Sequence, residues 1–269
     1  MGNAGHCTCG CGCLHGLRRA DLQSSEEETQ QKGVGSHRGC GICRRDSGGH
    51  SDRPDTDAAL TGQSVCRKRM RLGKEFTKEI GIQTGVFRMK NDILLKYRML
   101  NAEEVNREIF KDFIRYQRVT KCWRKENGKW IIKDAPFIDD WAEKDYQYLI
   151  LCLKNTINSN GFVYAAFYDG KLKGFVSVES EIFGGKQGYC DLSSIHISED
   201  MRRKGIGRTL FLAAREWAKQ KGAKKLYISA HSAVESQAFY KSMGCVEAEV
   251  YNQKHVEDEP YDCQLECGL

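Results

Sequence analysis

The chain has 269 residues, of which 40% are hydrophobic and 29% charged, which is ordinary for a globular protein. Its formal net charge of +6 suits an anionic ligand, but it does not by itself indicate nucleic-acid binding. No apolar run approaches the roughly 18 residues of a membrane-spanning helix, and no secretory signal is visible. We therefore expect a cytoplasmic protein with no nucleic-acid or membrane partner, whose 13 cysteines are thiols.

The composition changes sharply near residue 75. Every Phe, Tyr and Trp lies at or beyond Phe76, whereas 13 of the 27 glycines and seven of the 13 cysteines precede it. Such a segment cannot bury enough apolar surface to offset its chain entropy. We predict a disordered Gly/Cys-rich extension over residues 1–88 and a folded domain over residues 89–269.

Cysteines and histidines are concentrated in two stretches of this extension, residues 6–15 and 40–43. Thiolates and imidazoles at this density suit Zn(II) or Cu(I). The spacing, however, matches no paired zinc-finger pattern, and one CxxC is a weak signal. We predict no metal site and keep a metal-binding extension as an alternative.

The first half of the folded domain contains two predicted helices and a hairpin. A strand over residues 93–100 leads to a helix with an Asn101/Glu104 capping box. Asn127-Gly128 predicts the turn of a hairpin, and a second helix begins near Asp139 and ends at Gly161. The apolar stripe that predicts the first helix consists of Val105, Ile109, Phe110, Phe113 and Tyr116.

The second half alternates strands and helices. Strands are predicted over 162–167, 172–180, 189–197 and 226–229, with a helix over 208–220 and another from the Ser232/Glu235 capping box to Gly244. The order predicts an α/β (α+β) fold with a mixed, mainly antiparallel central sheet flanked by helices, and a parallel pair near its centre.

One loop carries the chemical signal. A strand is followed by Arg202-x-x-Gly205-x-Gly207 and then by a helix. Amides at a helix N-terminus have no helical acceptor and lie at the positive end of the dipole, so they bind anions. Glycines let a phosphate approach the backbone, and Arg203, Lys204 and Arg208 add charge. The loop lacks a GxxxxGK[ST] pattern and the third glycine of the dinucleotide fingerprint.

This loop, together with Phe239-Tyr240 and Gly244 on a later predicted helix, resembles the GNAT superfamily of N-acetyltransferases over about residues 92–269. The resemblance implies acetyl-CoA as co-substrate and Tyr240 as the group that protonates the leaving thiolate. An Asn that the family often carries on that helix is absent, and Ser232 and Ser236 are the nearest polar residues. The implied cofactor-binding residues are Ile195, Ile197, Arg202, Arg203, Lys204, Gly205, Ile206, Gly207, Arg208, Thr209 and Ser236.

The general base is expected on the strand before the loop, where the resemblance puts it nine to eleven residues before Arg202. Asp191 is the first candidate, because strand alternation places it on one face with Ser193 and Ile195. Glu179 on the neighbouring strand is the second candidate. His196 has a suitable intrinsic pKa, but its parity points away from Asp191.

The sequence says least about the acyl acceptor. In the family, acceptor specificity comes largely from the region here spanning residues 101–160, where Asp139, Asp140 and Glu143 are suited to attract a cationic amine. We expect direct transfer of an acetyl group to a primary amine of a small molecule, with a protein amine as a second option. A non-catalytic acyl-CoA-binding sensor or interaction module is the alternative function, and a homodimer is left open.

Overall fold

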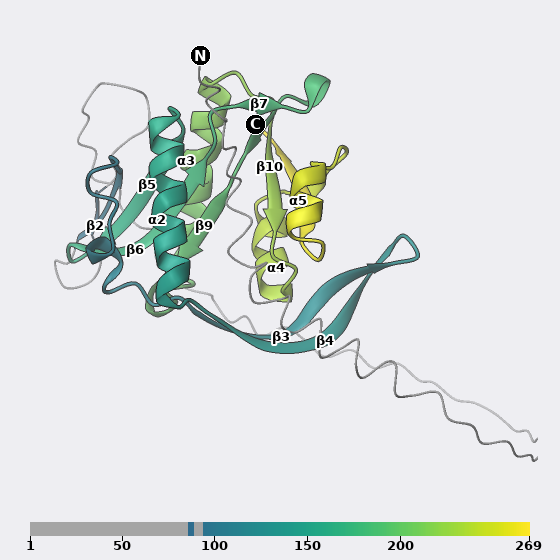
Figure 1. Ribbon diagram of the computed structural model, residues 1–269, viewed down its shortest axis with the longest axis horizontal. Coiled ribbons are helices and arrows are strands. Elements are labelled where there is room, and N and C mark those ends of the chain that lie inside the picture. Colours follow the sequence, from purple (N-terminus) through teal and green to yellow (C-terminus); the bar gives the residue numbers. More distant parts are fainter. Residues whose placement is uncertain (1–85, 89–93) are drawn as a thin grey trace, which may run out of the picture.

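The computed structural model describes residues 86–88 and 94–269, whose strands form two five-stranded sheets and a separate hairpin (Figure 1). In the first sheet all neighbours are antiparallel, in the order β1-β2-β5-β6-β9. Its strands are β1 (Val86–Arg88), β2 (Leu94–Met99), β5 (Phe162–Tyr168), β6 (Lys171–Val178) and β9 (Ser194–Ile197).

The second sheet contains the predicted parallel pair, formed by β8 and β10, while its other neighbours are antiparallel. The mixed, mainly antiparallel fold is thereby confirmed. The strand order is β11-β12-β10-β8-β7. The strands are β7 (Ile182–Phe183), β8 (Tyr189–Asp191), β10 (Lys225–Ala230), β11 (Val246–Glu247) and β12 (Cys263–Gly268).

The single strand predicted over 189–197 is divided between the two sheets. The Leu192 N–H still donates to the Tyr227 carbonyl of β10 at 2.9 Å, but two residues later Ser194 lies opposite Ser177 of β6. The chain therefore leaves β10 at Leu192 and continues as β9 beside β6. Among the described residues no strand pairs with the edge of β9 that faces β10, so a wedge opens between β9 and β10.

Helices cover both faces of the first sheet (Figure 1). Alternate residues of β5 point to opposite sides: Phe162 and Tyr164 pack with α3, whereas Val163 and Ala165 pack with α2. The helices are α2 (Glu143–Asn158), α3 (Ile206–Gln220), α4 (Val234–Ser242) and α5 (Gln253–Asp258), with short 3-10 turns η1 (Glu108–Phe110), η2 (Gly185–Gln187) and η3 (Glu199–Met201). None of the helices in the described residues is long and apolar enough to cross a membrane.

The helix predicted after Asn101 is wrong, since this stretch forms turns and η1. The Asn101/Glu104 box does form, with N···O distances of 2.8 and 3.0 Å. The Asn106 side chain, however, accepts the Ile109 N–H at 3.2 Å and starts a new turn in competition with the helix. Three residues of the predicted stripe are still buried in the core beside α2: Val105, Phe110 and Phe113.

The predicted hairpin is confirmed and is longer than expected, with β3 spanning Tyr116–Glu126 and β4 spanning Lys129–Asp140. Asn127 and Gly128 both have positive φ, 50° and 76°, as a type I′ turn requires. The second helix starts later than predicted because Asp139 belongs to β4.

The strand β1 lies inside the extension predicted over residues 1–88 and pairs with β2. The sheet therefore begins before the predicted boundary at residue 89. The rest of that extension, with both cysteine-rich stretches, lies outside the described residues.

Gly161 was predicted to end α2, but the left-handed residue there is Asn160, with φ of 60°. Gly161 instead permits close packing: a Cβ would lie 2.7 Å from the Thr156 carbonyl oxygen and 2.8 Å from that of Val178. These backbone atoms cannot move without disturbing α2 or β6.

We therefore expect Gly161→Ala to lower the free energy of unfolding by about 1–3 kcal/mol in urea denaturation, as overpacking typically does. Gly268→Ala is the matched control, because a Cβ there meets nothing within 4 Å. Equal stability of the two variants would contradict this account of Gly161.

Candidate functional site

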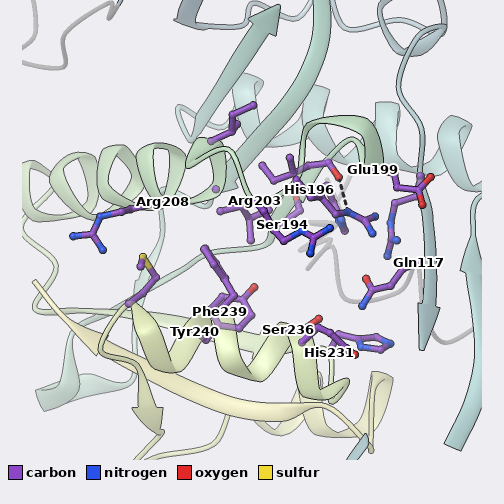
Figure 2. Close-up of a pocket in the computed structure, with 18 of the residues that line it drawn as sticks. Gln117, Ser194, His196, Glu199, Arg203, Arg208, His231, Ser236, Phe239 and Tyr240 are labelled. Atoms are coloured by element: carbon purple, nitrogen blue, oxygen red, sulfur yellow. Dashed lines mark hydrogen bonds between the residues drawn. The ribbon is translucent and has the colours of Figure 1, made fainter. Parts of the chain in front are cut away.

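The wedge between β9 and β10 widens into a cleft of about 910 Å³. Figure 2 shows Arg203, Ser194 and His196 on one side, and Tyr240 and Ser236 of α4 on the other. The start of β3 lines one end. The cleft therefore joins the glycine-containing loop to the predicted proton donor.

The loop leaves backbone amides free at the start of α3, where an anion could bind. Gly205, the N-cap, has φ of 85°, and the first turn of the helix contains no acidic residue and no side-chain cap. The amides of Ile206, Gly207 and Arg208 have no acceptor within the helix, whereas the Thr209 amide donates to the Gly205 carbonyl at 3.1 Å. These three amides of the first helical turn are thus available to an anion.

Gly207 also sets how closely the loop approaches α4. A Cβ at this position would lie 3.3 Å from Cε2 of Phe239 and 3.7 Å from Ile197 Cγ1. A glycine therefore lets the first turn of α3 contact the residue next to Tyr240, so the anion site and the phenol belong to one cleft.

Two of the predicted phosphate-binding cations have other contacts. The Arg202 guanidinium donates to the carbonyls of Ile197 at 3.3 Å and Tyr116 at 2.6 Å. Its burial, and then the nearby Arg115, lower the pKa of Arg202. Lys204 Nζ bonds to the Asp200 carbonyl at 3.0 Å and does not line the cleft.

Arg203 and Arg208 remain as the basic residues of the loop that line the cleft without a bond of their own. Ile195, Ile197, Arg202, Gly205, Ile206, Gly207 and Ser236 line it as well, whereas Lys204 and Thr209 do not.

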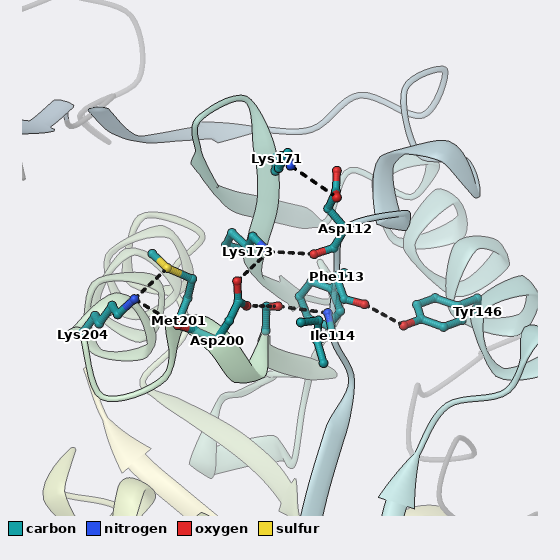
Figure 3. A network of polar contacts seen from close by, with 10 residues as sticks. Asp112, Phe113, Ile114, Tyr146, Lys171, Lys173, Asp200, Met201 and Lys204 are labelled. Atoms are coloured by element: carbon teal, nitrogen blue, oxygen red, sulfur yellow. Dashed lines mark hydrogen bonds and ion pairs between the residues drawn. The ribbon is translucent and has the colours of Figure 1, made fainter. Parts of the chain in front are cut away.

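A polar network fixes the segment before the loop (Figure 3). The buried Lys173 ammonium bonds to the Asp112 carbonyl at 2.7 Å and to the Asp200 carboxylate at 2.8 Å. The Ser198 hydroxyl donates to Asp200 at 2.5 Å and accepts the Ile114 N–H at 3.0 Å. The residues before β3 and those before α3 are therefore held by one charged centre.

The hairpin spans the open end of the wedge. One end of β3 is bound to the loop through the Tyr116 carbonyl, and further along the strand the Trp123 N–H donates to the Ser232 carbonyl at 2.8 Å. The Ser232 hydroxyl accepts from Arg124 at 2.9 Å, so it does not cap α4. The predicted capping box is therefore wrong, and Ala233 is the N-cap.

Tyr240 lies on α4 with its side chain almost fully buried at the cleft. Burial raises the pKa of the phenol far above its ordinary value, with the nearby Cys245 as a smaller cause. The hydroxyl therefore stays protonated throughout the neutral range and is able to donate a proton.

A model of the acetyltransferase (GNAT) family matches residues 119–245. These residues are a GNAT acetyltransferase domain. The match contains the loop, the N-terminus of α3 and Tyr240, so the predicted resemblance is confirmed over these residues, and the domain is of the acyltransferase type. No curated protein matches the chain.

Several solved structures are similar to this chain. A protein of Bacillus anthracis str. Ames, described as a streptothricin acetyltransferase in complex with acetyl coenzyme A, is 16% identical, with a TM-score of 0.50 over 65% of this chain and 98% of that one. A nourseothricin acetyltransferase is 16% identical, with a TM-score of 0.48 over the same shares. A PaiA N-acetyltransferase of Thermoplasma acidophilum, in complex with coenzyme A, is 19% identical, with a TM-score of 0.42 over 65% and 99%.

Asp191, the first candidate for the general base, lies away from the cleft. Leu192 lies in the apolar cluster against which Ile195 and Ile197 also pack. An even-numbered and two odd-numbered residues thus share one face, so the alternation of side chains shifts by one residue where the strand breaks. Asp191 therefore faces the other side, contrary to the predicted parity. Its carboxylate lies 2.7 Å from Nε2 of His255 on α5, and the sequence contains no signal for this pairing.

The second candidate lies behind the cleft wall. The Glu179 carboxylate accepts from Thr156 at 2.8 Å and from Ser193 at 2.7 Å. Burial raises its pKa, while these two hydrogen bonds lower it less. Glu179 does not line the cleft, but Ser193 and Ser194 do.

The acidic residues expected to attract an amine are engaged elsewhere. Asp139 is buried in an ion pair with Arg115, and Glu143 bonds to Arg107 at 2.8 Å. Neither they nor Asp140 lines the cleft. His196 does, with its ring centroid 4.8 Å from that of Trp141. In the part of the chain that the structure describes, no three potential ligands group into a metal site.

The Asp191–His255 pair predicts a pH dependence of stability. Burial opposes charging of His255, but the charge and hydrogen bond of Asp191 outweigh it and raise its pKa above 6.5. A histidine whose pKa is raised in the folded state stabilises the fold most below its unfolded pKa of about 6.5. This stabilisation is lost as the pH rises through the folded-state pKa. Removing the carboxylate takes away the two main causes that raise the pKa of His255, so that burial, which lowers it, is opposed only by the weaker effect of the Asp258 charge.

We therefore expect the stability advantage of the wild type over Asp191→Asn to be largest near pH 6 and to shrink as the pH rises towards 8, in urea unfolding at each pH. An advantage that is constant with pH would show that His255 does not carry the proton.

Proposed function

We propose that the protein transfers an acetyl group from acetyl-CoA directly to a primary amine of a small molecule. The observation that carries this proposal is one cleft that joins three free helix-N-terminal amides to a protonated tyrosine. An anion site at one end and a proton donor at the other match the two ends of a coenzyme A thioester.

The donor end fits coenzyme A. The amides of Ile206 to Arg208 and the side chains of Arg203 and Arg208 supply partners for a pyrophosphate. Beside them runs the unpaired edge of β9, which contains Ile195 and Ile197. Such an edge accepts an extended amide-containing chain as an added strand, and the pantetheine arm is of this kind.

The acceptor end is enclosed by the hairpin. Contacts of β3 reach from the loop before α3 to the start of α4, across the mouth of the wedge. An acceptor has to enter beside this strand, and this favours a small amine over the side chain of a folded protein. Gln117 of β3 and His231 lie at this end (Figure 2).

Acyl transfer needs a neutral amine, stabilisation of the oxyanion and protonation of the departing sulfur. Tyr240 is suited to the last step because its phenol is protonated at neutral pH. A backbone N–H on the unpaired edge of β9 is suited to the oxyanion. The amine is deprotonated by a base at the other side of the reacting carbon.

We expect the basic residues that line the cleft to contribute to acetyl-CoA binding. In calorimetric titration with acetyl-CoA, we expect an Arg203→Ala/Arg208→Ala variant to bind about 10- to 100-fold more weakly, since each charged contact with phosphate contributes about 1 kcal/mol or more. Lys204→Ala, whose ammonium bonds to Asp200 outside the cleft, is the control and should bind within about twofold of the wild type. Equal binding by all three proteins would place the pyrophosphate elsewhere.

We expect the Tyr240 hydroxyl to contribute to turnover and not to acetyl-CoA affinity. With a panel of small primary amines, release of coenzyme A thiol should fall about 100-fold in kcat for Tyr240→Phe, the usual scale of general-acid catalysis. Affinity for acetyl-CoA should change by less than about threefold, because the phenol acts on the leaving group. Tight acetyl-CoA binding with no turnover of any amine would favour the non-catalytic module instead.

A further inference from the structure

A chain of hydroxyl groups runs from the cleft wall to the partly buried carboxylate of Glu179, where the strands diverge. The Ser194 and Ser177 hydroxyl oxygens lie 2.6 Å apart, and those of Ser177 and Ser193 lie 2.8 Å apart. The Ser193 hydroxyl donates to Glu179 at 2.7 Å. Ser193 and Ser194 line the cleft, whereas Ser177 is fully buried.

The direction of these hydrogen bonds follows from counting protons. Each serine hydroxyl has one proton to donate. Ser193 gives its proton to Glu179, so it accepts from Ser177, and Ser177 in turn accepts from Ser194. All the donors therefore point towards the carboxylate. The second lone pair of the Ser193 oxygen remains for a donor N–H from the cleft.

Glu179 is an unusual carboxylate for a purely structural role. Hydroxyl groups of Thr156 and Ser193 both donate to its Oε1 atom, and it forms no salt bridge to any of the described residues. Removing a carboxylate from water without a cation costs free energy, and burial raises its pKa towards neutrality. A partly buried carboxyl group with a raised pKa, joined to a cleft by hydrogen bonds, is typical of a proton-transfer site.

We propose that Ser193 relays the proton of the attacking amine to Glu179, which makes Glu179 the terminal proton acceptor of the transfer. This proposal rests on the proposed acetyltransferase function. Ser193 is the group that touches the amine, and Glu179 acts through it. Asp191 is excluded from this role because its carboxylate faces His255 on the other side of the strand.

The amine nitrogen forms a bond to the thioester carbon, and the carbon–sulfur bond breaks. The proton of the nitrogen passes to the Ser193 oxygen as the Ser193 proton passes to Glu179. The sulfur leaves with the bonding electron pair and takes a proton from Tyr240. The products are the acetylated amine and the free thiol, with Glu179 protonated and Tyr240 ionised until they exchange protons with solvent.

The test is the pH dependence of kcat in three variants and a control, measured with saturating acetyl-CoA and one amine. Rates should rise with pH as Glu179 ionises. Thr156→Val removes a hydrogen bond that lowers the pKa of Glu179, so it should move this rise to higher pH and change the plateau by less than about threefold. Glu179→Gln should abolish the rise and lower the plateau about 100-fold or more.

Ser193→Ala should lower the plateau by a similar factor, because the amine then has no hydroxyl to receive its proton. Ser180→Ala is the control: it removes a neighbouring hydroxyl that bonds to the Ser159 carbonyl at 2.6 Å, outside the relay, and it should match the wild type. Thermal unfolding and acetyl-CoA affinity of each variant separate loss of the relay from loss of the fold.

An unchanged rate and pH profile in folded Glu179→Gln or Ser193→Ala would overturn the relay while leaving acetyl transfer intact. A wild-type protein that acetylates no amine would overturn the proposed function and the relay together. A Thr156→Val profile that does not move would also contradict the relay, because that variant retains both relay residues and removes a hydrogen bond to the Glu179 carboxylate.

Discussion

The separation of β9 from β10 after Leu192 is the constraint on which the rest of the structure depends. Up to that residue the chain is bonded to β10, and beyond it the chain belongs to the sheet of β6. One strand thus serves two sheets, and the space between them is the cleft. The break also leaves an unpaired strand edge, shifts the side-chain alternation by one residue and brings Ser193 against Glu179.

Such a wedge would be easy to close or deform if the two sheets were joined only at the break. The hairpin gives them a second connection, through the Tyr116 carbonyl at the loop and the Trp123 amide at α4. The buried Lys173 then ties the approach to β3 to the segment before α3. These contacts fix the distance between the anion site and α4, and preorganisation of this kind is what binding and catalysis need.

Burial acts on the acidic groups of the site in a consistent way. It raises the pKa of Tyr240 and of Glu179, since both would gain a negative charge in a poorly solvated place. For the Tyr240 phenol, the result is a hydroxyl group that keeps its proton at neutral pH. For a carboxyl group, the result is a base whose affinity for protons is closer to the working pH. The same physical effect therefore suits the two groups to opposite tasks.

Much of the domain could be predicted from local sequence. Asn127-Gly128 determines its turn through backbone preference, and the loop from Arg202 to Gly207 predicts a helix start with free amides through its glycines. Alternating apolar residues likewise indicate most strands. These features depend on residues close together in the chain, so a pattern is sufficient to find them.

Features that depend on distant segments were decided only by the tertiary structure. The apolar stripe after Asn101 resembles a helix, yet Asn106 redirects the backbone and its apolar residues pack as turns. The face of Asp191 depends on a strand break that no local pattern marks, and His255 joins it from 64 residues away. Serine hydroxyls carry no periodic signal, so only the register of β6 against β9 could bring Ser177, Ser193 and Glu179 together.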